Sequence, residues 1–325
     1  MSKIVTIGGG TGTFTVLLGL KGKGHELSAV VAMSDDGGST GRLRTEMGVL
    51  PPGDIRQALV ALSGEEQLML DLFNYRFGKG NLSGHNFGNL LLAALEKITG
   101  DFEKAVEAAQ KILKVEGQVI PVTTSETELF VKLESGQEVA GENVIDDEPP
   151  ESLRDALVSE IYLNPHVQIT EKARQAISSA DLILLGPGDF WGSLMANLVV
   201  DGVKEALLNS KAKKVLVLNL MTRWGQKGFK ASDYLSWVEK YTKLDYVLIN
   251  NTDFNEEIVK LYEKDYEYPV EDDLGESEEC LVIRSDLLSV KTYKQEETDV
   301  VKRSLLRHDS AKIAEAVLEI LNSEL

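Results

Sequence analysis

The chain opens with Lys3-Ile4-Val5-Thr6-Ile7-Gly8-Gly9-Gly10-Thr11-Gly12-Thr13, an apolar segment that runs directly into a cluster of glycines. A helical pattern follows over residues 14–20, so the order is strand, tight turn, helix. Because glycine has no Cβ atom, backbone amides at such a helix N-terminus can approach an anion closely. A turn that only packs helix against sheet is the alternative. We expect a phosphate-binding turn, with these ligand-binding residues: Gly9, Gly10, Thr11, Gly12 and Thr13.

The glycine cluster differs from two common phosphate-binding motifs. Gly8 and Gly10 fit the dinucleotide pattern G-x-G-x-x-G, but Thr13 occupies the position of its last glycine. No Gly-Lys-Ser/Thr triplet follows, so the segment is not a P-loop. Thr11 and Thr13 instead offer hydroxyl groups that can donate to a phosphate oxygen.

Length and charge limit the classes of function. A chain of 325 residues with 43% hydrophobic content can bury a substantial core. Its net charge of −18 repels the nucleic-acid backbone and anionic lipid, so we expect no nucleic-acid partner. One cysteine, Cys280, excludes an intrachain disulfide. No apolar run approaches the roughly 20 residues that span a bilayer, and we expect a cytoplasmic protein without membrane insertion.

Apolar segments with strand character alternate with helical patterns along the chain. The expected strands cover residues 28–33, 182–186, 215–220 and 246–250, and the expected helices cover residues 171–180, 193–209 and 232–241. This rhythm predicts an α/β fold with a doubly wound, mostly parallel, Rossmann-like sheet. Ligands on such sheets bind beyond the carboxyl ends of the strands.

We expect one α/β domain over residues 1–325 that carries two insertions. Residues 55–115 contain helical patterns, at 87–99 and 101–113 among others, and form a helical insertion. Residues 118–150 form the second, a small β-hairpin that turns at Ser135-Gly136 and ends in an acidic, proline-bearing loop at 146–150.

The second expected strand ends in a polar, glycine-rich loop, Ser34-Asp35-Asp36-Gly37-Gly38-Ser39-Thr40-Gly41-Arg42. A carboxylate in this place holds ribose hydroxyls in dinucleotide folds, and paired aspartates can also hold Mg²⁺ on phosphates. Gly37 and Ser39 belong to what looks like a second anion-binding loop. The alternative is an Asx turn that caps the next helix.

Basic and polar side chains follow that loop. Arg42, Arg44 and Arg56 lie close to the two glycine-rich loops, and guanidinium groups bind phosphate in a bidentate manner. Surface ion pairs are the alternative for each arginine taken alone. His85 lies in a glycine-bounded turn with Asn86 and Asn89, where an imidazole can act as general acid, base or hydrogen-bond donor.

Later strands also end in groups that can bind a ligand. The strand at 182–186 ends in Gly186-Pro187-Gly188-Asp189, a second strand–glycine–helix junction, and the next strand ends in Asn219-Leu220-Met221-Thr222-Arg223. Such groups at several strand ends predict one composite cleft. The candidates here are Gly186, Gly188, Asn219, Thr222 and Arg223.

A series of sequence blocks then occurs in one order along nearly the whole chain. The blocks are Ile7-Gly8-Gly9-Gly10-Thr11-Gly12, residues 34–42 as quoted above, Pro51-Pro52-Gly53-Asp54-Ile55-Arg56, His85-Asn86-Phe87-Gly88-Asn89-Leu90, Gly186-Pro187-Gly188, Asn197-Leu198, Asn219-Leu220-Met221-Thr222 and Arg307-His308-Asp309. In this order they resemble the YvcK/CofD-like family, the YvcK branch more than the CofD branch.

The resemblance implies a CofD-like fold and two kinds of activity. CofD enzymes are 2-phospho-L-lactate transferases that move a phospholactyl group from a guanylated donor to a deazaflavin, with Mg²⁺. YvcK members are described as gluconeogenesis factors that bind UDP-sugars and affect cell shape and cell-wall synthesis. The family's motifs place the phosphate loop on residues 8–13 and catalytic or Mg²⁺-linked carboxylates on Asp35 and Asp36, with Asp36 as the candidate metal ligand. They place further contacts, catalytic or ligand-binding, on His85, Asn86, Asn89, Asn219, Thr222 and Arg307.

The chain departs from the YvcK pattern in two places. Where YvcK members usually read Gly-Pro-Gly-Ser-Leu-Tyr-Thr-Ser, this chain has Gly186-Pro187-Gly188-Asp189-Phe190-Trp191-Gly192-Ser193. Where they read Met-Thr-Gln-Pro-Gly-Glu-Thr, it has Met221-Thr222-Arg223-Trp224-Gly225-Gln226-Lys227. Asp189 would repel a phosphate that it faced, whereas Arg223 would attract one.

Three functions are compatible with the sequence. The first is a cytoplasmic factor that binds a UDP-sugar or another nucleotide-diphosphate ligand and regulates cell shape, cell-wall synthesis and gluconeogenic growth. The second is a Mg²⁺-dependent transferase of phosphorus-containing groups, in which Asp35, Asp36 and His85 are the catalytic candidates. The third is a nicotinamide-dependent oxidoreductase, against which Thr13 and the second glycine-rich loop weigh. Mg²⁺ is the cofactor that these hypotheses involve. A homo-oligomer is also compatible with the sequence.

Overall fold

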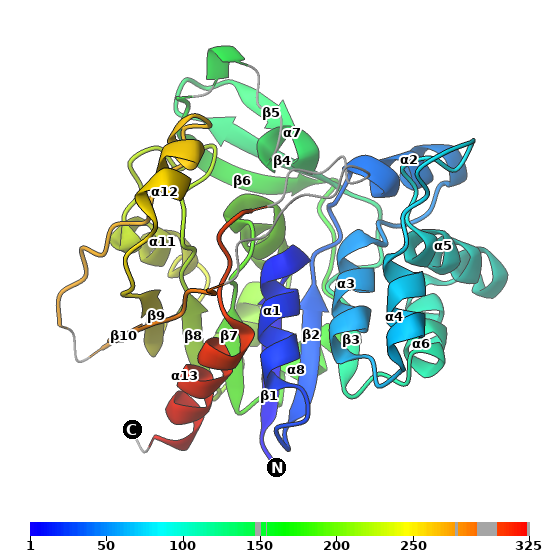
Figure 1. Ribbon diagram of the computed structural model, residues 1–325, viewed down its shortest axis with the longest axis horizontal. Coiled ribbons are helices and arrows are strands. Elements are labelled where there is room, and N and C mark those ends of the chain that lie inside the picture. Colours follow the sequence, from blue (N-terminus) through cyan, green and yellow to red (C-terminus); the bar gives the residue numbers. More distant parts are fainter. Residues whose placement is uncertain (147–150, 154, 277–278, 291–303, 324–325) are drawn as a thin grey trace.

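The computed structural model describes residues 1–146, 151–153, 155–276, 279–290 and 304–323. Its centre is a seven-stranded sheet in the order β10-β9-β8-β7-β1-β2-β3 (Figure 1), and the recorded pairs of neighbouring strands are all parallel. The strands are β1 Lys3–Gly8, β2 Glu26–Val31, β3 Gln118–Pro121, β7 Leu182–Leu185, β8 Lys213–Val217, β9 Tyr246–Asn250 and β10 Leu281–Ser285. The predicted doubly wound, mostly parallel sheet is confirmed.

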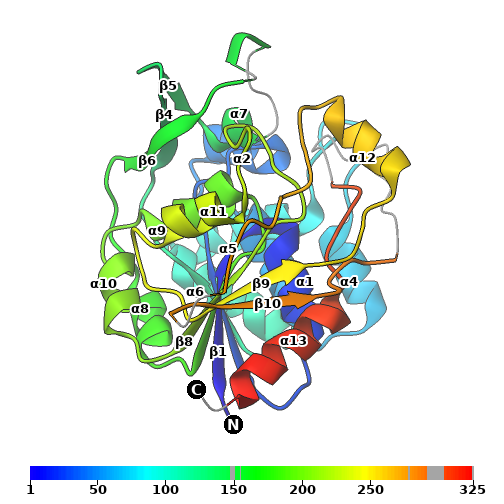
Figure 2. The same ribbon diagram turned by 90° about the vertical axis from the view of Figure 1, so that its left-hand side faces the viewer.

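Helices cover both faces of this sheet, which explains the near-continuous apolar character of its central strands. The helices α1 (Gly10–Leu20), α3 (Gly53–Leu62) and α13 (Ser310–Asn322) lie on one face (Figures 1 and 2). The helices α8 (Glu171–Ser178), α10 (Val203–Asn209) and α11 (Ala231–Val238) lie on the other. All four residues of β7 are therefore buried.

The order of the strands places a topological switch point beside β1. The chain builds the sheet outward from β1 to β2 and β3 in one direction, and from β7 to β8, β9 and β10 in the other. Loops that leave β1 and β7 at their carboxyl ends therefore diverge from neighbouring positions. Open α/β sheets bind their ligands at such a point.

The region from residue 53 to residue 112 is helical, as the sequence indicates. It contains α3, α4 (Gln67–Asn74), α5 (Phe87–Thr99) and α6 (Phe102–Ile112), and α2 (Gly38–Met47) precedes it. The side chains of Asn86 and Asp101 cap α5 and α6, and a left-handed Gly100 ends α5. However, α3 packs against α1, β2 and β3, so this first helix belongs to the layer that covers the sheet.

A small antiparallel sheet, β5-β4-β6, lies beyond the carboxyl ends of the large sheet (Figure 1). Its strands are β4 Glu128–Leu133, β5 Glu138–Ala140 and β6 Val158–Asn164, and α7 (Glu142–Asp146) and the short helix η1 (Glu151–Leu153) connect them. The hairpin expected around residues 135–136 joins β4 to β5. Residues 118–121 instead form β3 of the large sheet. The expected acidic loop lies mostly outside the described residues, which exclude 147–150.

The structure differs from the sequence pattern behind β7. One helix is expected over residues 193–209, but the chain forms a π-helix, η2 (Phe190–Met195), followed by α9 (Ala196–Leu198) and α10. The pattern also misses β6 and β10, which lie at the edges of their sheets, as well as α12 (Glu256–Glu263) and α13. None of the described helices is long and apolar enough to cross a membrane.

Candidate functional site

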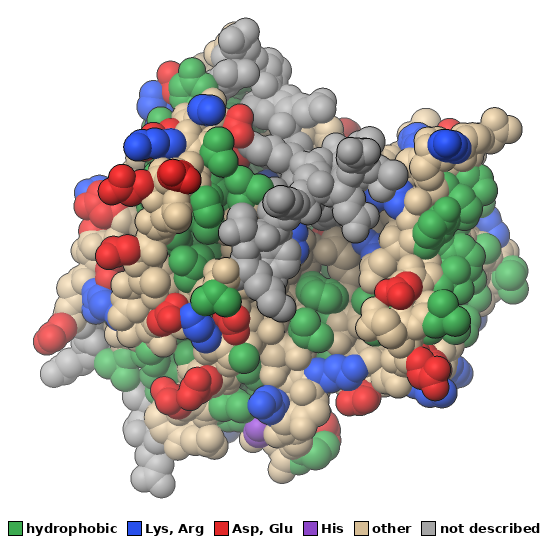
Figure 3. Space-filling view, viewed as in Figure 1, with side chains coloured by type: hydrophobic (Ala, Val, Ile, Leu, Met, Phe, Trp, Pro, Cys, Tyr) green, Lys and Arg blue, Asp and Glu red, His purple; other side chains and the backbone are tan. Residues whose placement is uncertain are grey.

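A cavity lies at the carboxyl edge of the large sheet, over the glycine turn that follows β1. The space-filling view shows a hollow near the middle of the face that is drawn (Figure 3). Loops that are up to 298 residues apart in sequence meet here, because the lining runs from Gly10 to His308. Among the predicted site residues, the lining contains Gly10, Thr11, Gly12, Asp35, Gly37, Ser39, Arg56, Asn89, Gly188, Asn219, Arg223 and Arg307.

The glycine turn supports the cavity through close backbone packing. α1 begins at Gly10, which has a left-handed φ of +59°, and no side chain caps the helix at Gly9. A Cβ atom added at Gly12 would lie 2.1 Å from the carbonyl oxygen of Pro187. The two junctions that follow β1 and β7 are therefore in direct contact. Of the two threonines in this turn, Thr11 lines the cavity. Thr13 is buried with its hydroxyl next to Gly8, and it lies outside the lining.

The two adjacent aspartates after β2 point in different directions. Asp35 lines the cavity, and its Oδ1 accepts a hydrogen bond of 2.9 Å from the Gly37 amide. Burial raises the pKa of the Asp35 carboxyl, although the hydrogen bonds from Gly37 and Thr40 oppose this. Asp36 lies outside the lining, and its Oδ1 accepts a hydrogen bond of 2.7 Å from the Asn143 amide at the start of α7. Asp36 thus fastens α7 over the site.

Arg56 is held rigidly at the cavity wall. Its side chain is buried, its Nε donates to Asn89 Oδ1 at 3.0 Å, and its Nη1 donates to Asn74 Oδ1 at 2.7 Å. Asn89 also lines the cavity. A second arginine, Arg76, lines the same wall and donates to the carbonyl oxygen of Gly84.

Three predicted residues on this side lie outside the lining. His85 is buried, and its Nδ1 lies 3.2 Å from the Ser39 hydroxyl. Burial, helped by the nearby Arg42, lowers the pKa of the His85 imidazole, so the ring is neutral at pH 7. Asn86 caps α5 through its side chain. Arg42 is exposed and donates to the carbonyl oxygen of Ser83. His85 and Asn86 therefore support Ser39 and α5, whereas Arg42 does not.

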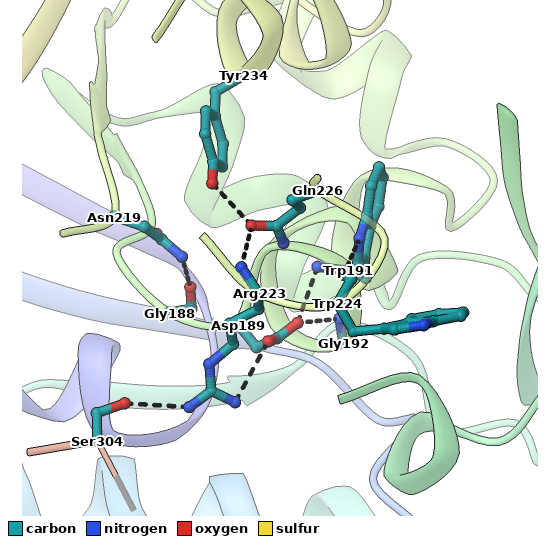
Figure 4. A network of polar contacts seen from close by, with 10 residues as sticks. All are labelled: Gly188, Asp189, Trp191, Gly192, Asn219, Arg223, Trp224, Gln226, Tyr234 and Ser304. Atoms are coloured by element: carbon teal, nitrogen blue, oxygen red, sulfur yellow. Dashed lines mark hydrogen bonds and ion pairs between the residues drawn. The ribbon is translucent and has the colours of Figure 1, made fainter. Parts of the chain in front are cut away.

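The loops after β7 and β8 form a connected polar network on the opposite side of the cavity (Figure 4). Asn219 donates to the carbonyl oxygen of Gly188 at 2.8 Å. Asp189 Oδ1 accepts the amides of Trp191 and Gly192, each at 2.9 Å, and so caps η2. Asp189 Oδ2 lies 3.7 Å from Arg223 Nη1. The carboxylate of Asp189 is thus compensated within the protein.

The other two residues predicted on these loops lie outside the lining. Gly186 has a left-handed φ of +73° at the turn that follows β7. Thr222 is buried, and its hydroxyl accepts a hydrogen bond of 3.0 Å from the Tyr268 amide. Both residues shape the loops rather than the cavity surface.

Comparison with known proteins agrees with this geometry. The family model described as 2-phospho-L-lactate transferase CofD matches residues 4–288. The chain belongs to the CofD family. Its resemblance to the YvcK/CofD-like family is thereby confirmed.

Curated relatives extend this family relationship over the full length. The chain is 37% identical over 323 residues to a putative gluconeogenesis factor of Thermotoga maritima, with 98% of this chain and 99% of that protein covered. It is 38% identical to the gluconeogenesis factor of Bacillus subtilis, with 98% of each covered. A crystal structure of a UPF0052 family protein from Bacillus halodurans superposes with a TM-score of 0.86 at 34% identity, covering 98% of this chain and 100% of that chain.

The sequence patterns do not identify several of the residues that line the cavity. Asp54 can be expected to cap α3, but the structure places its carboxylate against the glycine turn, since a Cβ atom added at Gly9 would lie 2.0 Å from Asp54 Oδ2. Ser193 of η2 lines the cavity next to the same turn. Glu142 at the start of α7 and Glu267, which follows α12, also line it. The Pro-Pro-Gly-Asp block around Asp54 was the available signal.

The charges of the lining decide what kind of ligand fits. Its described residues include four arginines and five carboxylates, which leaves one formal negative charge: Arg56, Arg76, Arg223 and Arg307 against Asp35, Asp54, Glu142, Asp189 and Glu267. A cation bound together with an anion would offset this excess of negative charge. The described residues hold no cluster of three or more His, Cys, Asp or Glu side chains placed to bind a metal ion. Mg²⁺ commonly uses only one or two protein carboxylates and completes its shell with phosphate oxygens and water.

Proposed function

We propose that this protein binds a nucleotide sugar, with a UDP-sugar as the leading candidate, and that it regulates cell shape, cell-wall synthesis and gluconeogenic growth in the cytoplasm. The observation that carries the proposal is the cavity at the switch point, which combines the glycine turn at the start of α1 with Arg56 and Asn89. Backbone amides at a helix N-terminus suit a diphosphate. The gluconeogenesis factors among the relatives support the regulatory part.

The charge balance of the lining supports a role for Mg²⁺. Asp35 and Asp54 fit the metal better than Asp36, because both line the cavity whereas Asp36 is bound to Asn143. Asp54 also lies against the glycine turn, where the diphosphate is proposed to bind. When bound, Mg²⁺ would neutralise phosphate charge. In this proposal the protein supplies the carboxylates of Asp35 and Asp54 near the glycine turn.

Calorimetric titration with UDP-N-acetylglucosamine, with and without Mg²⁺, tests both parts. We expect binding that Mg²⁺ strengthens, and we expect Asp35→Asn and Asp54→Asn each to weaken Mg²⁺-dependent binding at least tenfold, which is about 1.4 kcal/mol. Asp36→Asn is the matched comparison, because its amide oxygen can still accept the Asn143 hydrogen bond. If Asp36→Asn alone removes the effect of Mg²⁺, the metal assignment is wrong. If no nucleotide binds, the proposed function is wrong.

A transferase of phosphorus-containing groups is the second candidate. The family model supports it by its description, and Asp35 supports it because a buried carboxyl with a raised pKa facing a ligand cavity is suited to proton transfer. In this reaction Asp35 would accept the proton of an acceptor hydroxyl, whose oxygen would form a bond to the phosphorus of the phospholactyl group. The bond from that phosphorus to the guanylate would break and the guanylate would leave, while Arg56 would stabilise charge on the transferred group. Turnover of a guanylated phospholactyl donor with a deazaflavin acceptor would favour this candidate over a binding factor.

A further inference from the structure

The part of the cavity that lies beyond the carboxyl ends of β8 and β9 has its own chemistry. We call it the β8–β9 wall and define it by the lining residues Leu220, Met221, Arg223, Tyr262, Glu267, Leu306 and Arg307, together with Asp189. Four of its members, Leu220, Met221, Tyr262 and Leu306, form a separate hydrophobic cluster. The Tyr262 hydroxyl accepts the Leu306 amide at 2.9 Å, which fixes the segment that crosses the wall.

The charges of the wall are balanced. Asp189 and Glu267 stand against Arg223 and Arg307, so the wall carries no net charge. The Asp189 and Arg223 side chains, 11% and 19% exposed, lie 3.7 Å apart. A pair this poorly exposed interacts more strongly than a surface pair, because little water screens it. A ligand carboxylate would have to compete with Asp189 for Arg223.

Arg223 is not free to swing away from this arrangement. Its Nη2 donates to the Ser304 hydroxyl at 3.0 Å, and its backbone amide donates to Gln226 Oε1 at 3.0 Å. Gln226 is fully buried and also accepts from the Tyr234 hydroxyl at 2.7 Å. Figure 4 shows Ser304 and Asp189 at the guanidinium and Gln226 at the backbone amide of Arg223. The donor directions of Arg223 are thus fixed before a ligand binds.

The two loops that depart from the YvcK pattern form one unit. Besides the Asp189–Arg223 pair, Trp191 Nε1 donates to the carbonyl oxygen of Trp224 at 3.2 Å. A Cβ atom added at Gly225, whose φ is +75°, would lie 2.8 Å from Trp191 Nε1. Glycine at this position therefore accommodates the Trp191 indole. The charged pair and the packed indole belong to the same contact between loops.

We propose that the β8–β9 wall binds the uncharged, hydroxyl-bearing sugar of the nucleotide sugar, and that the Asp189–Arg223 pair makes the site prefer neutral sugars to acidic ones. The proposal rests on the proposed function. A balanced set of charged donors and acceptors can hydrogen-bond hydroxyl groups without a net charge to compensate, and the apolar cluster can pack against the C–H face of a sugar ring. An acidic sugar would bring an unpaired carboxylate close to Asp189 and Glu267, which disfavours it.

Calorimetric titration of UDP-glucose and UDP-glucuronic acid, which differ by one carboxylate, tests the preference. For the unmodified protein we expect UDP-glucose to bind at least tenfold more tightly. In Asp189→Asn we expect that ratio to fall at least tenfold, because one negative charge leaves the wall while asparagine still caps η2. Asp71→Asn is the matched control, since it changes the net charge equally on the exposed surface of α4 and should leave the ratio unchanged.

The outcomes separate the two levels of the argument. Equal affinity for both ligands in the unmodified protein, or an unchanged ratio in Asp189→Asn, overturns the inference while the proposed function stands. A ratio that shifts equally in Asp71→Asn also overturns it, because net charge would then be the cause. If neither UDP nor any UDP-sugar binds, the proposed function falls and takes the inference with it. The ratio within one variant reports on the wall even where the variant lowers overall stability.

Discussion

At the scale of single residues, backbone direction decides which of two chemically equal groups meets the ligand. Asp35 and Asp36 are adjacent, yet only Asp35 lines the cavity, while Asp36 binds the Asn143 amide. The backbone bends into α2 immediately after them, so successive side chains point to different sides. A motif can therefore locate a site without naming the carboxylate that acts in it.

Arg56 is the arginine whose loss should weaken nucleotide binding most clearly. We expect Arg56→Ala to raise the dissociation constant tenfold or more, about 1.4 kcal/mol, because Asn89 and Asn74 hold its guanidinium at the cavity wall. Titration calorimetry with a UDP-sugar measures this. Arg42→Ala should change affinity less than twofold, since that side chain is exposed and bound to Ser83. An unaltered titration in Arg56→Ala would show that this arginine only supports α5.

At the scale of elements, the site depends on two crossovers that touch. The turn between β1 and α1 packs against the turn between β7 and η2, and Asn197 ties them together by donating to the carbonyl oxygens of Gly8 and Ser193. Ser193 in η2 faces the glycine turn. A π-helix is rare and frequently marks a functional site, and here it brings Ser193 to the cavity.

Gly12 should be the position where this contact between crossovers tolerates a side chain least. Gly12→Ala places a methyl group 2.1 Å from the Pro187 carbonyl oxygen, which is backbone and cannot rotate away. We expect a loss of about 1–3 kcal/mol in the free energy of unfolding, measured by urea titration, together with weaker nucleotide binding. Gly275→Ala, with no atom near the added methyl group, is the control and should be neutral. Equal stability of the two variants would contradict the proposed packing.

The same contacts explain how far the sequence predicts this site. The strands β1, β2, β7, β8 and β9, the glycine turn and α5 follow from local patterns, because glycine spacing and apolar runs encode them directly. The position of Asp54 against Gly9 depends on how α3 packs on α1, which local pattern does not encode. For the same reason Asp189 looked like a group that would repel phosphate. The negative charge of Asp189 is compensated by two backbone amides of its own loop and by Arg223. Arg223 lies 34 residues later in the chain, so local pattern does not reveal this contact.

At the scale of the whole molecule, the last segment of the chain completes the cavity. Ser304, Leu306, Arg307 and His308 line it, and backbone hydrogen bonds hold this segment: the Ser289 amide donates to the Arg307 carbonyl oxygen, and the Asp309 amide donates to the Leu287 carbonyl oxygen. α13 then packs against α1, the helix that starts at the glycine turn. The first and last helices are thus mechanically connected through the site.

His308, in this last segment, makes the free energy of unfolding depend on pH. Burial lowers the pKa of its imidazole to about 4, against an ordinary value of 6.5. Between these values the unfolded chain binds a proton that the folded protein does not, so the free energy of unfolding falls as the pH falls from 6.5 toward 4. At pH 5 the loss from this group is about 2 kcal/mol relative to pH 7, at 1.36 kcal/mol per pKa unit.

Replacing this histidine isolates its share of the acid sensitivity from that of the carboxylates. His308→Gln keeps a polar side chain that cannot be protonated, and we expect the difference in unfolding free energy between pH 7 and pH 5 to shrink by about 2 kcal/mol relative to the unmodified protein. Urea titrations of both proteins at the two pH values provide the four numbers needed. His166→Gln is the control, because the His166 side chain is exposed, and it should leave the difference in unfolding free energy between the two pH values unchanged. An equal difference in His308→Gln and the unmodified protein would mean that the folded protein protonates His308 as readily as the unfolded chain does, so that burial does not lower its pKa.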